Sequence, residues 1–211
     1  MIKMIVVDLD GTLLNDDRDG KNISSYTMSI LNKCREKGIK IVIATGRSRL
    51  QAEEIIDLIK PDSSILNYGA LILNENKDIV FNKLLSLETP DEIDNGYMEK
   101  VAQEYKYFKP LSTEEIDQLL TVKLDYNKMN AIEIISKDQN IPLSEIAAFG
   151  DGLYDIEMIK NCGTGVAMEN AEHAVKMASK DICGNNNEDG VAKWIERNIL
   201  QTENEQKYYI L

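Results

Sequence analysis

The chain has 211 residues and a net charge of −12, and 43% of its residues are hydrophobic while 28% are charged. These values are typical of one compact globular core with a small insert, and they exclude a disordered chain. Because lysines and arginines are scattered along the chain, the negative charge disfavours nucleic acid as a partner. No apolar run approaches the length of a membrane span, so we expect a cytoplasmic protein with no membrane partner.

The chain begins with a strand–helix–strand pattern. Residues 1–7 and 39–44 are short apolar runs, which predict two buried parallel strands. Between them, Ser24 and Ser25 can cap a helix, and Gly38 can end it. The segment therefore predicts the first βαβ unit of an α/β fold.

The alternation continues beyond the second strand. Ser48 opens a second predicted helix, Pro61 stops it, and residues 64–67 predict a third strand. Residues 71–73 and 79–81 flank a polar turn and predict a β-hairpin that leaves the core.

The pattern changes after the hairpin. Two helical stretches follow, and one of them begins with the capping box formed by Ser112 and Glu115. We therefore predict a small cap inserted at 82–121, between two parts of a catalytic core at 1–81 and 122–211.

Strand and helix patterns then alternate to the C-terminal region. Strands are predicted at 122–124, 146–149, 165–167 and 181–183, and helices at 130–139, 153–160, 171–178 and 191–198. The whole chain thus predicts an α/β fold with a doubly wound, Rossmann-like parallel sheet.

Two aspartates, Asp8 and Asp10, follow the first predicted strand directly. Since side chains alternate along an extended chain, both carboxylates point the same way and converge on one site. Asp8 suits attack on phosphorus and Asp10 suits protonation of the leaving oxygen. The pair favours Mg²⁺ as a partner, and Gly11 lets the backbone turn beside a ligand. A single pair of this kind also occurs where a strand merely ends in a turn.

Thr45, Gly46 and Arg47 follow the second predicted strand, where the loops of an open sheet form the ligand crevice. The Thr45 hydroxyl can donate to a phosphate oxygen. Lys128 precedes a predicted helix and can hold the nucleophile and the phosphate together. Taken singly, a segment like Thr45-Gly46-Arg47 is more often a strand-to-helix turn with a surface arginine, and a single lysine is more often a solvated surface cation.

A second acidic cluster follows the predicted strand at 146–149. Asp151 lies where it can complete a metal site at the carboxyl end of the sheet. Asp155 lies four residues further, at a helix start, where a carboxylate also favours the positive end of the helix dipole. We therefore assign Asp155 a supporting role.

Four segments resemble, in order, the motifs of the haloacid dehalogenase superfamily: DLDGTLLN from Asp8, ATGR from Ala44, the lysine of Asn127-Lys128, and GDGLYDIEM from Gly150. Residues 165–171 and 188–192 are similar to its Cof-type branch, which dephosphorylates small phosphorylated metabolites. The resemblance covers residues 1–83 and 122–199. It implies a magnesium-dependent phosphatase that acts on small phosphorylated substrates, such as sugar phosphates, through an aspartyl-phosphate.

The resemblance also implies a role for each matched residue. Asp8 would be the nucleophile and a metal ligand, and Asp10 the general acid/base with its main-chain carbonyl on the metal. Asp151 would be the third metal ligand. The phosphate would be bound by residues of the matched loops: Gly11, Thr45, Gly46, Arg47 and Lys128.

The chain departs from the Cof-type pattern in three ways. Tyr154 and Tyr68 stand where that branch usually or often has asparagine, and both changes add bulk near the pocket. The insert at 82–121 is considerably shorter than the usual cap. We therefore expect an open pocket, covered by a larger substrate or by a neighbouring subunit of a homo-oligomer.

Two other functions remain open at the level of sequence. A phosphotransferase or phosphomutase of the same superfamily would use Asp8 but pass the phosphoryl group to a sugar hydroxyl. A non-catalytic binding protein with the same fold is the other alternative, motivated by Tyr154 and the short insert.

Overall fold

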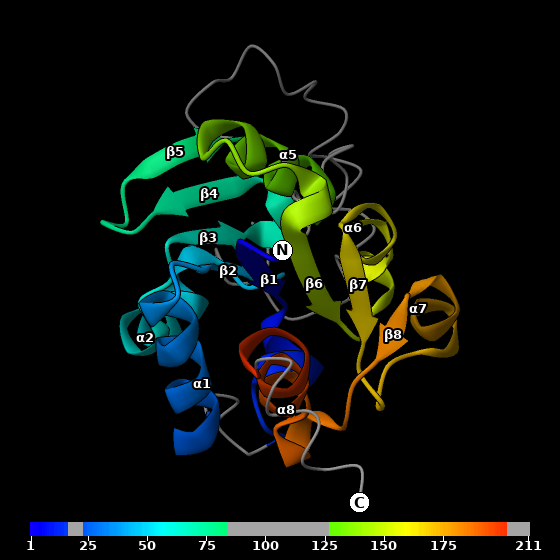
Figure 1. The fold of residues 1–211 in the computed structure, drawn as a ribbon. Coiled ribbons are helices and arrows are strands. Elements are labelled where there is room, and N and C mark those ends of the chain that lie inside the picture. The colour runs from blue at the N-terminus through cyan, green and yellow to red at the C-terminus, as the bar shows by residue number, and fades with distance from the viewer. Residues whose placement is uncertain (17–22, 84–126, 202–211) are drawn as a thin grey trace, which may run out of the picture.

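The computed structural model describes residues 1–16, 23–83 and 127–201. Its centre is one eight-stranded sheet in the order β5-β4-β3-β2-β1-β6-β7-β8 (Figure 1). The strands are β1 (Met4–Val7), β2 (Lys40–Ala44), β3 (Ser63–Leu66), β4 (Leu71–Asn74), β5 (Ile79–Asn82), β6 (Ile146–Gly150), β7 (Thr164–Ala167) and β8 (Asp181–Ile182).

The middle of the sheet is parallel and buried on both faces. β1 pairs in parallel with β2 on one side and with β6 on the other, and all four residues of Met4–Val7 are buried. Since helices cover both faces of a parallel sheet, its strands are continuous apolar runs rather than alternating ones. The ends of β1, β2 and β6 therefore meet at the carboxyl edge of the sheet, where ligands bind in such folds.

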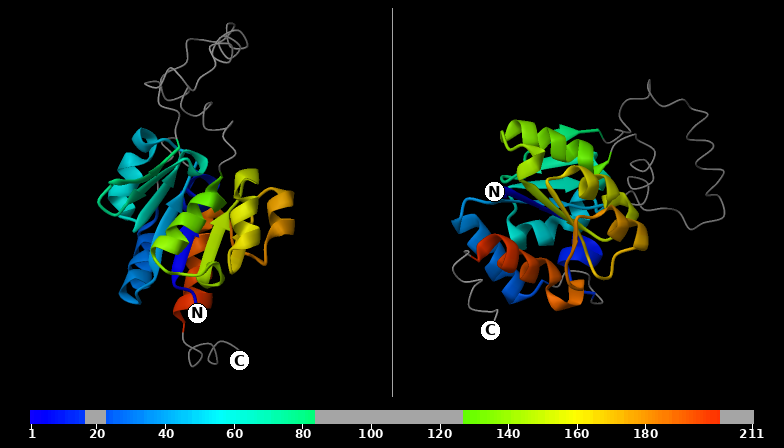
Figure 2. Two further views of the ribbon diagram at one scale, coloured as in Figure 1. Left: turned by 90° about the horizontal axis from the view of Figure 1, so that it is seen from above. Right: turned by 45° about the vertical axis from the view of Figure 1, so that its right-hand side comes forward.

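Helices lie on both faces, as the right-handed crossover rule requires. α1 (Ser25–Glu36), α2 (Arg49–Ile59) and α8 (Gly190–Ile195) lie on one face, and α5 (Lys128–Asp138), α6 (Ile156–Asn161) and α7 (His173–Ala178) on the other (Figures 1 and 2). The predicted doubly wound α/β sheet is confirmed.

The predicted caps of the first two helices are confirmed. The Ser24 side chain accepts from the backbone N–H of Thr27 at the start of α1. Ser48 forms a capping box with Gln51 at the start of α2, and Lys60, the C-cap after Ile59, is left-handed. Local sequence is sufficient here because each cap satisfies backbone groups within one turn.

The bounds of several predicted elements shift, and three differences affect the sheet or the pocket. The hairpin of β4 and β5 does not leave the core, because β4 pairs antiparallel with β3 and extends the same sheet. α5 begins at Lys128, two residues earlier than predicted, because Asn127 and Asn130 form a capping box there. The helix predicted at 153–160 is split into a 3-10 turn, Leu153–Asp155, and α6.

The predicted cap and the predicted strand at 122–124 lie outside the described residues, apart from Asn82, the last residue of β5, and Lys83 after it. The division into a core at 1–81 and 122–211 and an insert at 82–121 therefore stays a prediction. Within the described ranges, no helix has the length and apolar character needed to span a membrane.

Candidate active site

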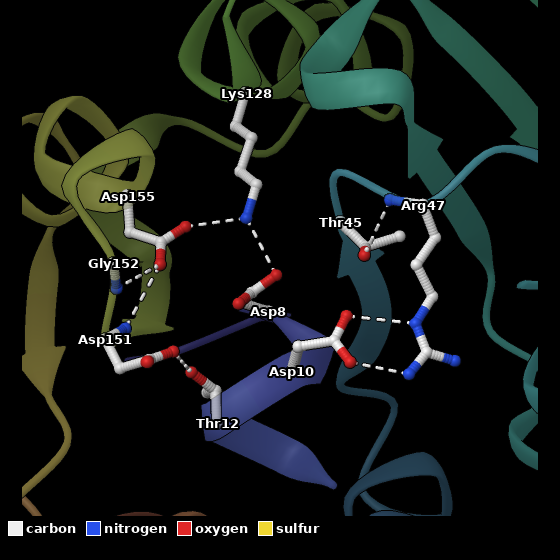
Figure 3. Close-up of polar contacts among 9 residues, drawn as sticks. All are labelled: Asp8, Asp10, Thr12, Thr45, Arg47, Lys128, Asp151, Gly152 and Asp155. Carbon is white, nitrogen blue, oxygen red and sulfur yellow. Dashed lines mark hydrogen bonds and ion pairs between the residues drawn. The ribbon is translucent and has the colours of Figure 1, made fainter. Parts of the chain in front are cut away.

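A pocket opens at the carboxyl ends of β1, β2 and β6, and its volume is about 620 Å³. This size is typical of sites for small ligands. Its lining is rich in charged groups and also holds two tyrosines: Asp8, Asp10, Gly46, Arg47, Leu50, Gln51, Glu54, Tyr68, Lys128, Asp151, Gly152, Tyr154 and Asp155. Loops that are far apart in the sequence thus meet at one place, as Figure 3 shows.

A buried lysine joins two of these loops. Lys128, only 3% exposed, donates from Nζ to Asp8 Oδ1 and to Asp155 Oδ1, and both distances are 2.7 Å. Oδ2 of Asp155 accepts the backbone N–H groups of Asp151 and Gly152 at 3.1 and 3.0 Å. One chain of charge-assisted hydrogen bonds therefore fixes the Asp8 carboxylate relative to the loop that carries Asp151.

Burial and charge act in opposite directions on this cluster. Burial is the largest effect on Asp8 and raises its pKa. The attraction of Lys128 lowers the pKa, and repulsion from Asp155 raises it, so that the pKa moves from 3.8 to about 7. Burial also raises the pKa of Asp151. For Lys128, burial favours the neutral form, but the charges of Asp8 and Asp155 outweigh it and raise its pKa. Lys128 is thus cationic at neutral pH, beside a carboxyl group that titrates there.

Asp151 is held by the segment that follows Asp8. The Thr12 hydroxyl donates to Asp151 Oδ1 at 2.7 Å. Gly11 has φ +69°, and a Cβ atom there would overlap the Asp151 carboxylate, so only glycine fits this turn. Asn170 donates from Nδ2 to the Gly11 carbonyl at 2.7 Å. Thr12 and Asn170 were not singled out as site residues, although both lie in segments that carry the family resemblance.

Asp10 has a different partner. Arg47 binds it with two bonds, Nε to Oδ2 at 2.9 Å and Nη2 to Oδ1 at 2.5 Å. The Asp10 side chain is 58% exposed, whereas that of Asp8 is 10% exposed. The two carboxylates share one pocket, as the alternation of side chains predicts, but in this arrangement Asp10 faces Arg47 (Figure 3).

Three carboxylates lie close enough to hold a metal ion. One oxygen each of Asp8, Asp151 and Asp155 lie within 4.8 Å of one another. Both oxygens of Asp155 already accept hydrogen bonds, whereas Asp8 and Asp151 engage only Oδ1 with other described residues. Asp8 and Asp151 are therefore the better ligands, and Asp155 suits a supporting position. Asp10 contributes no carboxylate oxygen to this cluster; its main-chain carbonyl remains the predicted ligand atom.

The other predicted phosphate-binding residues lie around the same loops. Gly46, Arg47 and Lys128 line the pocket. Thr45 is fully buried, and its hydroxyl accepts the backbone N–H of Arg47 at 3.1 Å, so it shapes the loop from within. Gly11 and Thr45 do not contribute to the pocket lining, and their contact with phosphate stays a prediction.

Several known proteins resemble this chain over nearly its whole length. A 5-amino-6-(5-phospho-D-ribitylamino)uracil phosphatase of Bacillus subtilis is 28% identical, over 94% of this chain and 96% of that protein. A phosphatase of the same name from Escherichia coli is 27% identical, over 96% of this chain and 97% of that protein. A phosphoglycolate phosphatase of Methanobrevibacter smithii is 23% identical, over 94% and 99%.

Solved structures show the same fold. A haloacid dehalogenase-like hydrolase from Bacteroides thetaiotaomicron superposes with a TM-score of 0.75 at 22% identity, over 93% of this chain and 99% of that one. A sugar phosphatase of the superfamily's subclass IIB superposes with a TM-score of 0.68 at 21% identity, over 92% of this chain and 98% of that one. The family model described as haloacid dehalogenase-like hydrolase matches residues 5–109 and 98–195. The chain belongs to this family, in its Cof-type branch, and is a phosphatase of the haloacid dehalogenase type.

Proposed function

We propose that this protein is a magnesium-dependent phosphatase of the cytoplasm that hydrolyses small phosphomonoesters through an aspartyl-phosphate on Asp8. One observation carries the proposal. The buried Asp8 carboxylate is held by Lys128 beside Asp151, inside a pocket that also contains Asp10 and Arg47. This arrangement supplies a nucleophile, a fixed cation and a second acid at one place.

In the first step, a carboxylate oxygen of Asp8 attacks phosphorus and the bond from phosphorus to the ester oxygen breaks. The carboxyl group of Asp10 gives its proton to the departing alcohol oxygen. In the second step, Asp10 takes a proton from water, whose oxygen attacks the same phosphorus and releases Asp8 and inorganic phosphate. Lys128 and Arg47 place positive charge beside the phosphoryl oxygens throughout.

Arg47 links substrate binding to the readiness of Asp10. In the structure, Arg47 occupies both carboxylate oxygens of Asp10. A phosphate group competes for the same guanidinium, because bidentate pairing with arginine suits phosphate as well as carboxylate. Arrival of a phosphorylated substrate therefore frees Asp10 to take up a proton from solvent and to turn toward the leaving oxygen.

The donor set fits Mg²⁺, which prefers oxygen ligands and tolerates several waters. Asp8 and Asp151 would hold it with one carboxylate oxygen each, and the Asp10 main-chain carbonyl is the predicted third ligand. When bound, the ion neutralises negative charge on the phosphoryl oxygens. Mutual repulsion among the clustered carboxylates is relieved at the same time.

The substrate we propose is a small phosphorylated metabolite, such as a sugar phosphate. The relatives named above act, by their names, on a phosphorylated ribitylaminouracil and on phosphoglycolate, which are both phosphomonoesters. We also propose a neighbouring subunit as a cover for the pocket, and sedimentation analysis with and without substrate would test this homo-oligomer.

The decisive experiment is phosphate release from a panel of sugar phosphates, nucleotides and p-nitrophenyl phosphate, with and without Mg²⁺. We expect magnesium-dependent release by the wild type and no release by Asp8→Asn, with folding intact by circular dichroism. An Asp8→Asn protein with normal turnover would contradict the aspartyl-phosphate route. Phosphoryl transfer to an added sugar without release of phosphate would instead identify a phosphotransferase.

A further inference from the structure

The two tyrosines that replace the usual asparagines contact each other. The ring centroids of Tyr68 and Tyr154 lie 4.6 Å apart, with an angle of 50° between the ring planes. Tyr68 follows β3 and Tyr154 follows β6, so they come from separate loops. Both line the pocket that contains Asp8 and Lys128. Two departures from the family pattern thus form one aromatic pair in the candidate active site.

Tyr68 is held in place at a conformational cost. Its φ of 56° and ψ of 19° are left-handed, a region that asparagine adopts far more readily than a bulky residue. Its ring lies directly against Gly46, because a Cβ atom on Gly46 would be only 2.8 Å from the Tyr68 hydroxyl oxygen. Gly46 therefore admits the ring, and the ring lies over the loop predicted to bind phosphate.

Tyr68 and Tyr154 line the pocket, and the ring of Tyr154 is exposed there rather than buried. Tyr154 is 57% exposed, and the neighbouring pocket residue Leu50 is 64% exposed. Burial raises the pKa of Tyr68, with a further contribution from Tyr154, so its hydroxyl remains a hydrogen-bond donor at neutral pH. Tyrosine rings bind planar groups by stacking and lose little side-chain entropy in doing so.

We propose that Tyr68 and Tyr154 form an aromatic wall that makes the enzyme prefer phosphomonoesters whose leaving group carries a planar ring. The inference rests on the proposed phosphatase activity and deepens it. The phosphate would lie at Asp8 and Lys128, and the planar group would lie against the exposed ring of Tyr154. Asparagine at both positions offers hydrogen bonds to a polyol but no ring surface.

The test compares benzyl phosphate with cyclohexylmethyl phosphate, two primary alkyl esters that differ in the planarity of the ring. We expect the wild type to prefer the benzyl ester in kcat/KM by roughly tenfold, the size of one stacking contact. Tyr154→Asn and the double variant with Tyr68→Asn should abolish this preference while retaining hydrolysis of the cyclohexylmethyl ester. Tyr154→Phe should keep the preference because it keeps the ring.

Two controls separate stacking from other effects. Leu50→Asn removes apolar surface from the same pocket without removing a ring, and Met177→Asn changes an exposed residue outside the pocket lining. Both should leave the ratio of the two esters unchanged. Equal rates for the two esters in the wild type, or a ratio that survives the double variant, would overturn the inference.

Failure of the aromatic wall is distinguishable from failure of the phosphatase function. Hydrolysis of both esters without preference refutes only the wall. Absence of hydrolysis of these esters and of the whole panel above refutes the phosphatase, and calorimetric binding of benzylphosphonate and cyclohexylmethylphosphonate then decides the inference by itself. Equal dissociation constants for the two phosphonates, or no binding of either, would overturn it.

Discussion

At the scale of single residues, the site depends on pairs of opposite charge with different degrees of burial. The Lys128 side chain is 4% exposed and lies between the carboxylates of Asp8 and Asp155. A buried lysine with two carboxylate partners fixes the positions of those carboxylates but adds little net stability, because the cost of desolvation offsets most of the attraction. The pair of Arg47 and Asp10 is far more exposed and can exchange partners at lower cost.

The raised pKa of Asp8 predicts how metal binding depends on pH. In the metal-free protein, this pKa is about 7 against an ordinary value of 3.8. Since Mg²⁺ binds the carboxylate form, its affinity should be weaker by roughly tenfold at about pH 6 than at about pH 8. Isothermal titration calorimetry at the two pH values measures this difference directly.

The same shift fixes the sign of a stability change. Because folding raises the pKa of Asp8, the folded protein binds the proton more tightly than the unfolded chain. The contribution of Asp8 to the stability of the metal-free protein is fully present below about pH 4. It is lost as the pH rises through about 7. Asp8→Asn should remove this dependence of stability on pH. Equal Mg²⁺ affinities of the wild type at both pH values would contradict the raised pKa of Asp8.

At the scale of elements, the loop after β6 is shaped by its own carboxylate. Asp155 accepts two backbone N–H groups from Asp151 and Gly152, and this bonding accompanies the 3-10 turn before α6. Asp155 is the third residue after the N-cap Gly152, a position from which a side chain reaches back to the N-cap N–H. The Asp155 carboxylate therefore fixes the backbone that carries Asp151.

Asp155→Asn tests this role. The amide keeps one acceptor oxygen but loses the charge opposite Lys128, so we expect a loss of about 1–3 kcal/mol in unfolding free energy. We also expect kcat/KM to fall by at least tenfold, because Asp8 and Asp151 lose their shared support. Urea unfolding and phosphate release measure the two effects.

Asp62→Asn provides the matched control. Asp62 accepts the backbone N–H of Ile41 and pairs with Lys40 near the start of β2 and β3, outside the pocket lining. The control should lower stability without lowering kcat/KM. If both variants lost activity in proportion to stability, Asp155 would have only a structural role.

At the scale of the whole molecule, contacts between distant parts of the chain join its first and last described α-helices. α1 packs against α8, and Asp189, at the start of α8, accepts hydrogen bonds from the hydroxyls of Ser24 and Thr27. Tyr26 also donates to Glu196 at 2.7 Å. These bonds join α1 to α8 and to the π-helix Glu196–Leu200 that follows it, on the face of the sheet opposite α5.

Replacement of Asp189 measures the strength of this connection. Asp189 has φ 58°, so Asp189→Ala both removes the acceptor and strains the backbone, whereas Asp189→Gly removes only the acceptor. We expect losses of about 2–4 kcal/mol for alanine and about 1 kcal/mol less for glycine. Equal stability of the alanine variant and the wild type in urea unfolding would contradict the connection.

The sequence by itself determined the parallel strands of the described ranges, the caps of the first two helices and the order of the chemical motifs. Apolar runs such as residues 4–7 and 40–44 have one interpretation, because only buried parallel strands tolerate them between helical patterns. The Ser24 and Ser48 caps are local, so sequence spacing alone predicts them. The doubly wound fold follows from this alternation, and the placement of Asp8 and Asp151 at strand ends follows with it.

Only the tertiary structure decided which side chains meet. Lys128 contacts Asp8 across 120 residues of sequence, and Tyr68 contacts Tyr154 although nothing in the sequence pairs these two departures from the family pattern. The hairpin of β4 and β5 looks independent in sequence, yet it completes the sheet because β3 would otherwise be an exposed edge. Local periodicity encodes an element and its buried face, whereas pairings between loops depend on strand order, which no local pattern contains.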